Sequence, residues 1–150
     1  MNVSNCDMSI LIDADGCPVV DITVRVAKQA GVSCVIICDN SHVFEKDGVR
    51  TITVDKGSDS VDFVLVNRVQ KGDIVVTQDY GLAAMCLSRG AVPINQNGML
   101  YTNDNIDALL MQRHTAKKIR VAGGRLKGPS KRTAEQDKAF ENALRGLLAT

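Results

Sequence analysis

The chain has 150 residues, of which 45% are hydrophobic and 23% are charged, and its formal net charge at neutral pH is +1. This length corresponds to one domain with a core of ordinary size. No apolar stretch approaches the roughly 20 residues that a membrane helix needs, and residues 1–7 lack the basic and apolar segments of a signal peptide. We therefore expect a cytoplasmic protein with no membrane attachment.

The cysteines indicate a reduced protein. Their number is odd and none has CxxC spacing, so we expect neither a disulfide framework nor a zinc site. They stand at Cys6, Cys17, Cys34, Cys38 and Cys86.

The first predicted strand is the apolar run Ile10-Leu11-Ile12, which is typical of a strand buried on both faces. Asp13 and Asp15 follow it directly. We expect Pro18 at the first helical position, where its missing N–H has no cost. Apolar residues then recur with helical periodicity up to Gly31, which predicts a helix that ends there.

Strands and helices alternate through the next sixty residues. Short apolar or alternating runs predict four further strands, at residues 32–38, 49–54, 73–77 and 91–95. Helices are predicted from a cap at Ser58 to Gly72, and from residue 80 to Gly90; the second and third strands can be linked directly. This order predicts an α/β fold of three layers, in which a mainly parallel five-stranded sheet carries helices on both faces.

The C-terminal part of the chain differs in composition. The segments predicted here are a helix capped by Asn103 or Asp104, a basic, glycine-bearing loop over 117–130, and a last amphipathic helix over 133–148. Thr133 and Gln136 have the spacing of a capping box. We expect residues 1–150 to form a single domain, with the loop and the last helix as its extension.

Charge is divided unevenly along the chain. Residues 1–107 carry 14 acidic and 8 basic side chains, a net charge of −6, whereas residues 108–150 carry 3 acidic and 10 basic side chains, a net charge of +7. This division indicates an acidic site beside a surface that attracts polyanions.

The basic segment is a candidate nucleic-acid interface. Residues 123–129 offer backbone amides and two cations that could cradle a phosphate, although a solvated loop has the same composition. With two Tyr, three Phe and no Trp, the chain has few aromatic side chains on which bases could stack. We therefore expect it to recognise the backbone and the shape of a nucleic acid. The side chains expected to contact nucleic acid, RNA in the first place, are Arg120, Arg125, Lys127, Lys131 and Arg132.

Aspartates follow two of the predicted strands and open one of the helices. Asp13 and Asp15 follow the first strand and Asp79 follows the fourth, at the carboxyl ends where ligands bind in open α/β sheets. Asp59 and Asp62 share a face of a helix's first turn. Like charges about 4 Å apart repel by about 4 kcal/mol at an effective dielectric of about 20, so such a cluster needs a counter-ion or protons. Because oxygen ligands favour Mg²⁺ or Mn²⁺, we predict a metal site from these five residues, with Asp13, Asp15 and Asp79 catalytic.

Each of these aspartates also has a purely structural interpretation. Aspartates after strands form turns and cap helices, and Asp79 could cap the helix that follows it. Asp59 and Asp62 suit a helix N-terminus through the helix dipole alone. Asp13 and Asp15 together favour a functional site, because one cap needs only one carboxylate.

Four segments of the chain, in order, resemble those of the YaiI/YqxD family of uncharacterised bacterial proteins. The match covers nearly the whole chain, so the resemblance is specific, although it implies no particular reaction. The segments are Asp13-Ala14-Asp15-Gly16-Cys17-Pro18, residues 72–83, residues 97–106 and residues 123–129.

A wider resemblance is to PIN-like nucleases, which carry an Asp after the first strand, an acid on a following helix and Thr-x-Asp after the fourth strand. Asp13 matches the first position, Asp59 or Asp62 the second, and Thr77-Gln78-Asp79 the third. Asp15 is an additional acid, and the basic tail is not part of that pattern. The resemblance implies a PIN-like fold and metal-dependent phosphodiester hydrolysis, on RNA.

Two alternative functions stay open at this point. Residues 10–16 also resemble the first motif of haloacid-dehalogenase-type phosphatases, with Asp13 as nucleophile and Asp15 as acid/base. Cys17-Pro18 departs from that motif, and Gly72-Asp73 precedes a strand instead of following one. The second alternative is a non-catalytic RNA-binding module with a vestigial or regulatory acidic pocket.

Overall fold

The computed structural model describes residues 8–39, 48–55, 60–112 and 131–149 of the chain. In chain order the helices and strands are β1 (Ser9–Asp13), α1 (Val20–Ala30), β2 (Ser33–Asp39), β3 (Arg50–Val54), α2 (Ser60–Arg68), β4 (Ile74–Val76), α3 (Tyr80–Ser88), β5 (Val92–Ile94) and α5 (Ala134–Leu148). Residues 106–112 are also helical.

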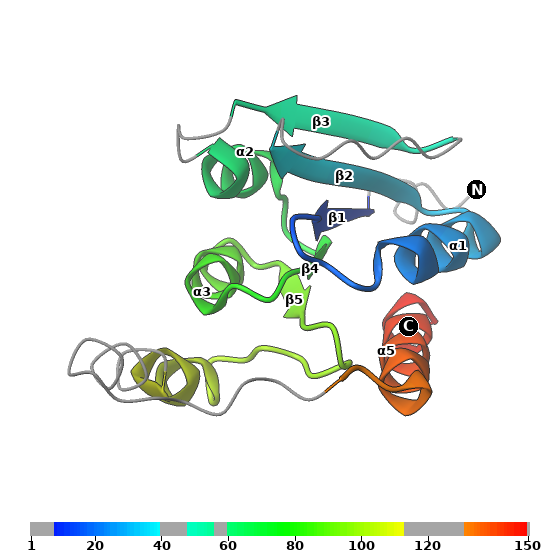
Figure 1. Cartoon of the computed structure of the whole chain (residues 1–150). Coiled ribbons are helices and arrows are strands. Elements are labelled where there is room, and N and C mark those ends of the chain that lie inside the picture. Colours follow the sequence, from blue (N-terminus) through cyan, green and yellow to red (C-terminus); the bar gives the residue numbers. More distant parts are fainter. Residues whose placement is uncertain (1–7, 40–47, 56–59, 113–130, 150) are drawn as a thin grey trace.

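The five strands form one sheet in the order β3-β2-β1-β4-β5, and every neighbouring pair is parallel. Helices α1 and α5 lie on one face of the sheet and α2 and α3 on the other (Figure 1). The prediction of a three-layer α/β fold with a parallel five-stranded sheet is therefore confirmed. The chain order reverses on either side of β1, which places β1 beside β4 at the topological switch point.

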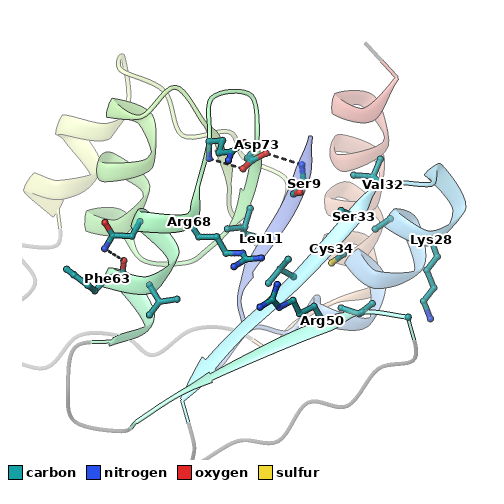
Figure 2. Close-up of a pocket in the computed structure, with 17 residues that line it drawn as sticks. Ser9, Leu11, Lys28, Val32, Ser33, Cys34, Arg50, Phe63, Arg68 and Asp73 are labelled. Atoms are coloured by element: carbon teal, nitrogen blue, oxygen red, sulfur yellow. Dashed lines mark hydrogen bonds between the residues drawn. The ribbon is translucent and has the colours of Figure 1, made fainter. Parts of the chain in front are cut away.

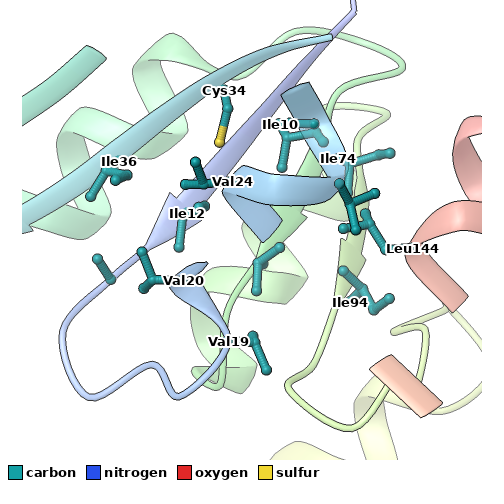
Figure 3. Packing of buried hydrophobic residues seen from close by; sticks show 14 of the residues in the cluster. Ile10, Ile12, Val19, Val20, Val24, Cys34, Ile36, Ile74, Ile94 and Leu144 are labelled. Carbon is teal, nitrogen blue, oxygen red and sulfur yellow. The ribbon is translucent and has the colours of Figure 1, made fainter. Parts of the chain in front are cut away.

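The central strand β1 supplies side chains to both layers of the core. Ile10 and Ile12 pack with α1 and α5, whereas Leu11 packs with α2 and α3, because successive side chains of a strand point to opposite faces. All three side chains are at most 1% exposed. Figure 3 shows Ile10 and Ile12 among the residues of the first of these two clusters.

The start of α1 differs from the prediction. The N-cap is Val19 and the first helical residue is Val20, so Pro18 lies before the helix and its predicted first helical position is wrong. A turn delays the helix, since the Cys17 N–H donates to the Ala14 carbonyl at 3.0 Å. The predicted end is confirmed, because Gly31 caps the helix with a φ of 70°.

Helix α2 ends earlier than expected, at Arg68 and not at Gly72. The Asp73 carboxylate accepts the Gln70 N–H at 2.8 Å, and the Asp73 N–H donates to the Gln70 carbonyl at 3.0 Å. These two hydrogen bonds form a turn that replaces the last helical turn.

The helix after β5 is capped by a residue other than those predicted. The Thr102 hydroxyl accepts the Asn105 N–H at 3.2 Å, and the Asn105 side chain accepts the Thr102 N–H at 2.9 Å. This reciprocal arrangement satisfies the first donors of the turn, so the prediction of a cap at Asn103 or Asp104 is wrong.

Helix α5 begins and packs as predicted. Thr133 and Gln136 form a capping box, and Phe140 and Leu144 are fully buried against the sheet. The stripe continues with partly buried Leu147 and Leu148.

Two further predictions concern cysteines and membranes. The four cysteines of the described ranges are free thiols, namely Cys17, Cys34, Cys38 and Cys86. In the described part of the chain no helix combines the length and the hydropathy of a membrane span. The predicted cap at Ser58 and the predicted loop over 117–130 lie outside the described residues.

Candidate functional site

A pocket opens where β1 and β4 end side by side. Ile12 of β1 pairs with Val76 of β4, so the residues that follow the two strands emerge together. The pocket has a volume of about 460 Å³ and is lined by Asp13, Asp15, Gln78, Asp79 and Tyr80. The three aspartates predicted to be catalytic therefore line one pocket at the carboxyl edge of the sheet.

Thr77 joins the two strand ends through its side chain. The Thr77 hydroxyl donates to Asp13 Oδ2 at 2.8 Å and accepts the Asp79 N–H at 3.0 Å. Its backbone is equally fixed, because the Thr77 N–H donates to the Ile94 carbonyl and the Tyr101 hydroxyl donates to the Thr77 carbonyl. Thr77 is 1% exposed, so this network is screened from water.

The carboxyl group of Asp13 is hard to ionise. Burial raises its pKa from the ordinary 3.8 to about 6, and the hydrogen bond from Thr77 partly opposes that shift. Three neighbouring negative charges raise the pKa further, those of Asp62, Asp79 and Asp15. Burial is thus the main reason why Asp13 holds its proton more tightly than an ordinary aspartate, and the neighbouring carboxylates add to this effect.

Asp79 has both of the roles considered for it. Its Oδ1 accepts the N–H groups of Gly81 at 2.9 Å and Leu82 at 3.2 Å, so it is the N-cap of α3. The same side chain lines the pocket. The two backbone N–H groups of the helix N-terminus hold the carboxylate in place.

Asp15 and Gln78 fix the turn that follows β1. The Asp39 N–H at the end of β2 donates to the Asp15 carboxylate, at 3.1 Å to Oδ2. Gln78 Nε2 donates to the Gly16 carbonyl at 2.9 Å, which ties this turn to the segment after β4. Asp15 therefore has a structural role in addition to lining the pocket.

Cys17, in the same turn, is not an activated thiol. Burial raises its pKa to about 11, and the charge of Asp13 contributes in the same direction. A thiol with this pKa stays protonated at neutral pH, so it is a poor nucleophile and a poor metal ligand.

The oxygen ligands of the pocket suit one kind of metal site and not another. Within the described ranges, no group of three or more His, Cys, Asp or Glu side chains could hold a metal ion. That geometry does not fit a cage built from protein ligands alone. Mg²⁺ usually keeps several waters and binds through one or two carboxylates plus substrate phosphates, and this donor set does fit the pocket.

The remaining predicted acids and bases are distributed as follows. Asp62 lies in the first turn of α2, where its charge acts on Asp13. Lys131 is exposed just before α5. Four predicted site residues lie outside the described part of the chain, namely Asp59, Arg120, Arg125 and Lys127.

Arg132 is engaged within the fold. Its Nε donates to Asp137 at 2.6 Å, and its two terminal nitrogens donate to the Asn97 side chain at 2.8 Å and the Gln96 carbonyl at 2.6 Å. The guanidinium group thus joins the start of α5 to the turn after β5. Fewer of its donors are left for the nucleic-acid contact that the sequence predicts.

The site contains residues that were not among the predicted set. The pocket is lined also by Gln78 and Tyr80, and Thr77 bonds to Asp13 in its wall. The ring of Tyr101 packs edge-on against the ring of Tyr80. One signal for Thr77 was present, because it precedes Gln78-Asp79 directly after a buried strand. No local pattern points to Tyr101, whose hydroxyl bonds to a residue 24 positions away.

These features define an α/β protein with a parallel sheet and an acidic pocket at the carboxyl ends of two central strands. Residues 11–150 match the model of the family described as "Uncharacterized BCR, YaiI/YqxD family". The chain belongs to this family, as the resemblance of its four segments indicated.

Relatives in three bacteria cover almost the whole chain, and each is called a UPF0178 protein. The protein of Exiguobacterium sibiricum is 54% identical over 141 residues, which are 94% of this chain and 96% of that protein. The protein of Ruminiclostridium cellulolyticum is 55% identical over 137 residues, 91% of this chain and 90% of that protein. The protein of Clostridium acetobutylicum is 49% identical over 143 residues, 94% of this chain and 97% of that protein.

Proposed function

We propose that the protein is a nuclease that hydrolyses phosphodiester bonds, in RNA, with the help of Mg²⁺ or Mn²⁺ bound in the acidic pocket. The observation that carries this proposal is the convergence of Asp13, Asp15 and Asp79 on one pocket at the switch point of the sheet. The resemblance to PIN-like nucleases supports it at Asp13 and at Thr77-Gln78-Asp79.

Asp13 is the principal candidate ligand for the cation. Its Oδ2 is occupied by the Thr77 hydroxyl, whereas its Oδ1 has no hydrogen-bond partner among the described residues. Thr77 fixes the orientation of the carboxylate, so that Oδ1 is left for a cation. Asp79 and Asp15 supply further negative charge at the pocket wall.

The bound ion would activate water and neutralise charge on the phosphate. The residues of the chain would hold and orient the reactants. A phosphate group is repelled by three carboxylates, so its approach depends on positive charge that the described residues of the pocket wall do not supply. The net charge of +7 on residues 108–150, which include Lys131, offers an attraction for the rest of the polyanion.

Cleavage of single-stranded RNA by the purified, metal-stripped protein tests this function. We expect cleavage only after Mg²⁺ or Mn²⁺ is added, and its loss in Asp13→Asn and in Asp79→Asn. Asp107→Asn is the matched control, because Asp107 is an exposed acid outside the pocket. Full cleavage by both pocket variants would assign the activity to a contaminant and overturn the proposal.

A second measurement tests the metal site without relying on activity. A cation that binds only the folded protein raises the free energy of unfolding by RT ln(1 + L/Kd), where L is the cation concentration, so the melting temperature rises with L. We expect Mn²⁺ to raise the melting temperature of the wild type and of Asp107→Asn, but not that of Asp13→Asn. An equal rise in all three proteins would remove Asp13 from the metal site.

The same geometry allows a phosphatase with Asp13 as nucleophile, because Asp13 Oδ1 is available at the pocket wall. That enzyme would form an aspartyl-phosphate on Asp13 when it meets a phosphomonoester. Detection of this adduct by mass spectrometry would replace the nuclease proposal. Metal-dependent stabilisation and RNA binding without any hydrolysis would instead identify a binding module.

A further inference from the structure

A second and larger cavity lies at the opposite edge of the sheet, where the strands begin. Its volume is about 1030 Å³, and its walls include Ser9 of β1, Cys34 of β2, Arg50 of β3 and the second half of α2. Figure 2 shows this cavity between α2 and the first residues of the strands. Along β1, Ser9 and Asp13 are four residues apart, which separates the two sites by about 13 Å.

Two arginines face each other across this cavity. Arg50 begins β3 and Arg68 ends α2, and Figure 2 shows their guanidinium groups directed into the same space. Neither side chain has an ion pair or a hydrogen bond with the residues that the structure describes. Lys28 of α1 also belongs to the lining, although Figure 2 shows its side chain directed away from the two arginines. The two guanidinium groups together favour the binding of an anion.

The acid in this lining does not neutralise the arginines. Asp73 is 3% exposed, and its two carboxylate oxygens accept backbone N–H groups, of Ser9 at 3.0 Å and of Gln70 at 2.8 Å. Its carboxylate is therefore committed to the backbone at the start of β4. Among the described residues of the lining there is no other acid, so the arginines are open to an external anion.

The rest of the lining is suited to the uncharged part of a small molecule. Leu11, Val35 and Val64 provide an apolar wall, while Ser33 and Asn67 provide hydrogen-bonding groups. Ligand pockets usually measure about 300–1,000 Å³ and combine apolar walls with a few polar groups, and this cavity has that size and composition.

We propose that this cavity is a binding site for a nucleoside phosphate. This site is separate from the acidic pocket, and the function proposed for that pocket does not depend on it. Arg50 and Arg68 hold the phosphate, because planar guanidinium groups form paired, charge-assisted hydrogen bonds with its oxygens. The base lies against the apolar wall, and the hydroxyl groups of the sugar meet the polar side chains.

Calorimetric titration with each of the four nucleoside 5′-monophosphates, in the presence of EDTA, tests this site. EDTA removes divalent cations, so the acidic pocket cannot hold a phosphate through a metal. We expect saturable binding of at least one nucleotide, weakened about tenfold or more by Arg50→Gln and by Arg68→Gln, since hydrogen bonds to charged groups contribute about 1.5–3 kcal/mol. Arg89→Gln is the matched control, because Arg89 is exposed at the end of α3, and it should bind as the wild type does.

Two further measurements distinguish binding in this cavity from binding in the acidic pocket. Asp13→Asn should leave nucleotide binding unchanged, which makes the result independent of the proposed nuclease activity. In the wild type, the bound nucleotide should shift the methyl resonances of Leu11 and Val35, a measurement that needs no variant.

Three results would overturn the proposal. One is the absence of saturable binding of any of the four nucleotides at millimolar concentration. The second is unchanged affinity in both arginine variants. The third is binding of inorganic phosphate, or of a nucleoside without phosphate, as tightly as the nucleotide, because the site is proposed to recognise both parts together.

Discussion

Thr77 Oγ1 lies 2.8 Å from Asp13 Oδ2, and this hydrogen bond joins two residues that are 64 positions apart in the chain. It is possible because β1 and β4 are neighbours in register, so that both residues stand at the end of a strand. The bond fixes the orientation of the carboxylate and favours its charged form, in a place where burial and three other carboxylates oppose that charge.

Replacement of Thr77 by Val should raise the pKa of Asp13 above about 6, because the hydroxyl that lowers it is removed. It should also lower the free energy of unfolding by about 1–3 kcal/mol, since the partly buried Asp79 N–H loses its acceptor. NMR titration of the aspartate carboxyl carbons and urea denaturation measure the two effects. Thr77→Ser keeps the hydroxyl and should stay close to the wild type in pKa. A pKa for Asp13 that is unchanged in Thr77→Val would show that the bond does not act on its charge.

Asp13→Asn should make the protein more stable at neutral pH. Asp13 has a folded-state pKa of about 6 against 3.8 for the ordinary group, so the folded protein binds the proton more tightly. The stability from this proton is fully present below about pH 4 and is lost as the pH rises through about 6. The ionised carboxylate then destabilises the fold by about 2–3 kcal/mol, which the neutral amide avoids.

Urea denaturation of the wild type and Asp13→Asn at several pH values measures this difference. The gain should be present at about pH 7.5 and should shrink towards zero at about pH 4. A variant that is less stable than the wild type at both pH values would contradict the assigned pKa.

Arg132→Gln should destabilise the attachment of α5 by about 1–3 kcal/mol, because the Gln96 carbonyl and the Asn97 side chain lose a charged donor. Arg145→Gln is a suitable comparison. Arg145 pairs with Glu141 on an exposed surface of the same helix, where water screens the charges and an ion pair contributes little to stability. Equal losses in thermal denaturation of the two variants would mean that Arg132 acts as an ordinary surface residue.

Gly98→Ala should be much more damaging than Gly31→Ala. Both glycines have positive φ angles, of 89° and 70°, so each substitution carries a backbone cost of about 1–2 kcal/mol. Only at Gly98 would the added Cβ also lie 2.7 Å from the Ala139 carbonyl oxygen of α5, whereas at Gly31 it meets nothing within 4 Å. Denaturation midpoints that fall equally in the two variants would contradict this contact between the turn and the helix.

The sequence alone is sufficient to predict the parallel sheet and to place Asp13 near Asp79. Ile10-Leu11-Ile12 and Ile74-Val75-Val76 are apolar throughout because both faces of their strands are buried, and this pattern is visible without a structure. Once two such strands are parallel neighbours, Asp13 and Asp79 must emerge at the same edge.

The contacts that refine the site could not be predicted from local patterns. The donors and acceptors around Thr77 depend on the register of β1 against β4, which apolar runs do not specify. The sequence alone places Arg132 with the basic segment, because its partners Gln96 and Asn97 lie 36 and 35 positions away. Helix starts were wrong where several capping residues stand together, as at Thr102, because each satisfies the same pattern.

The position of α5 constrains the order in which the protein folds during synthesis. Phe140 and Leu144 cover the same face of the sheet as Ile10 and Ile12, although they leave the ribosome well over a hundred residues later. Until then α1 alone covers that face of β1, so part of it stays open to aggregation and to chaperones in a nascent chain. The core on this face of β1 is therefore complete only after translation has passed the last helix.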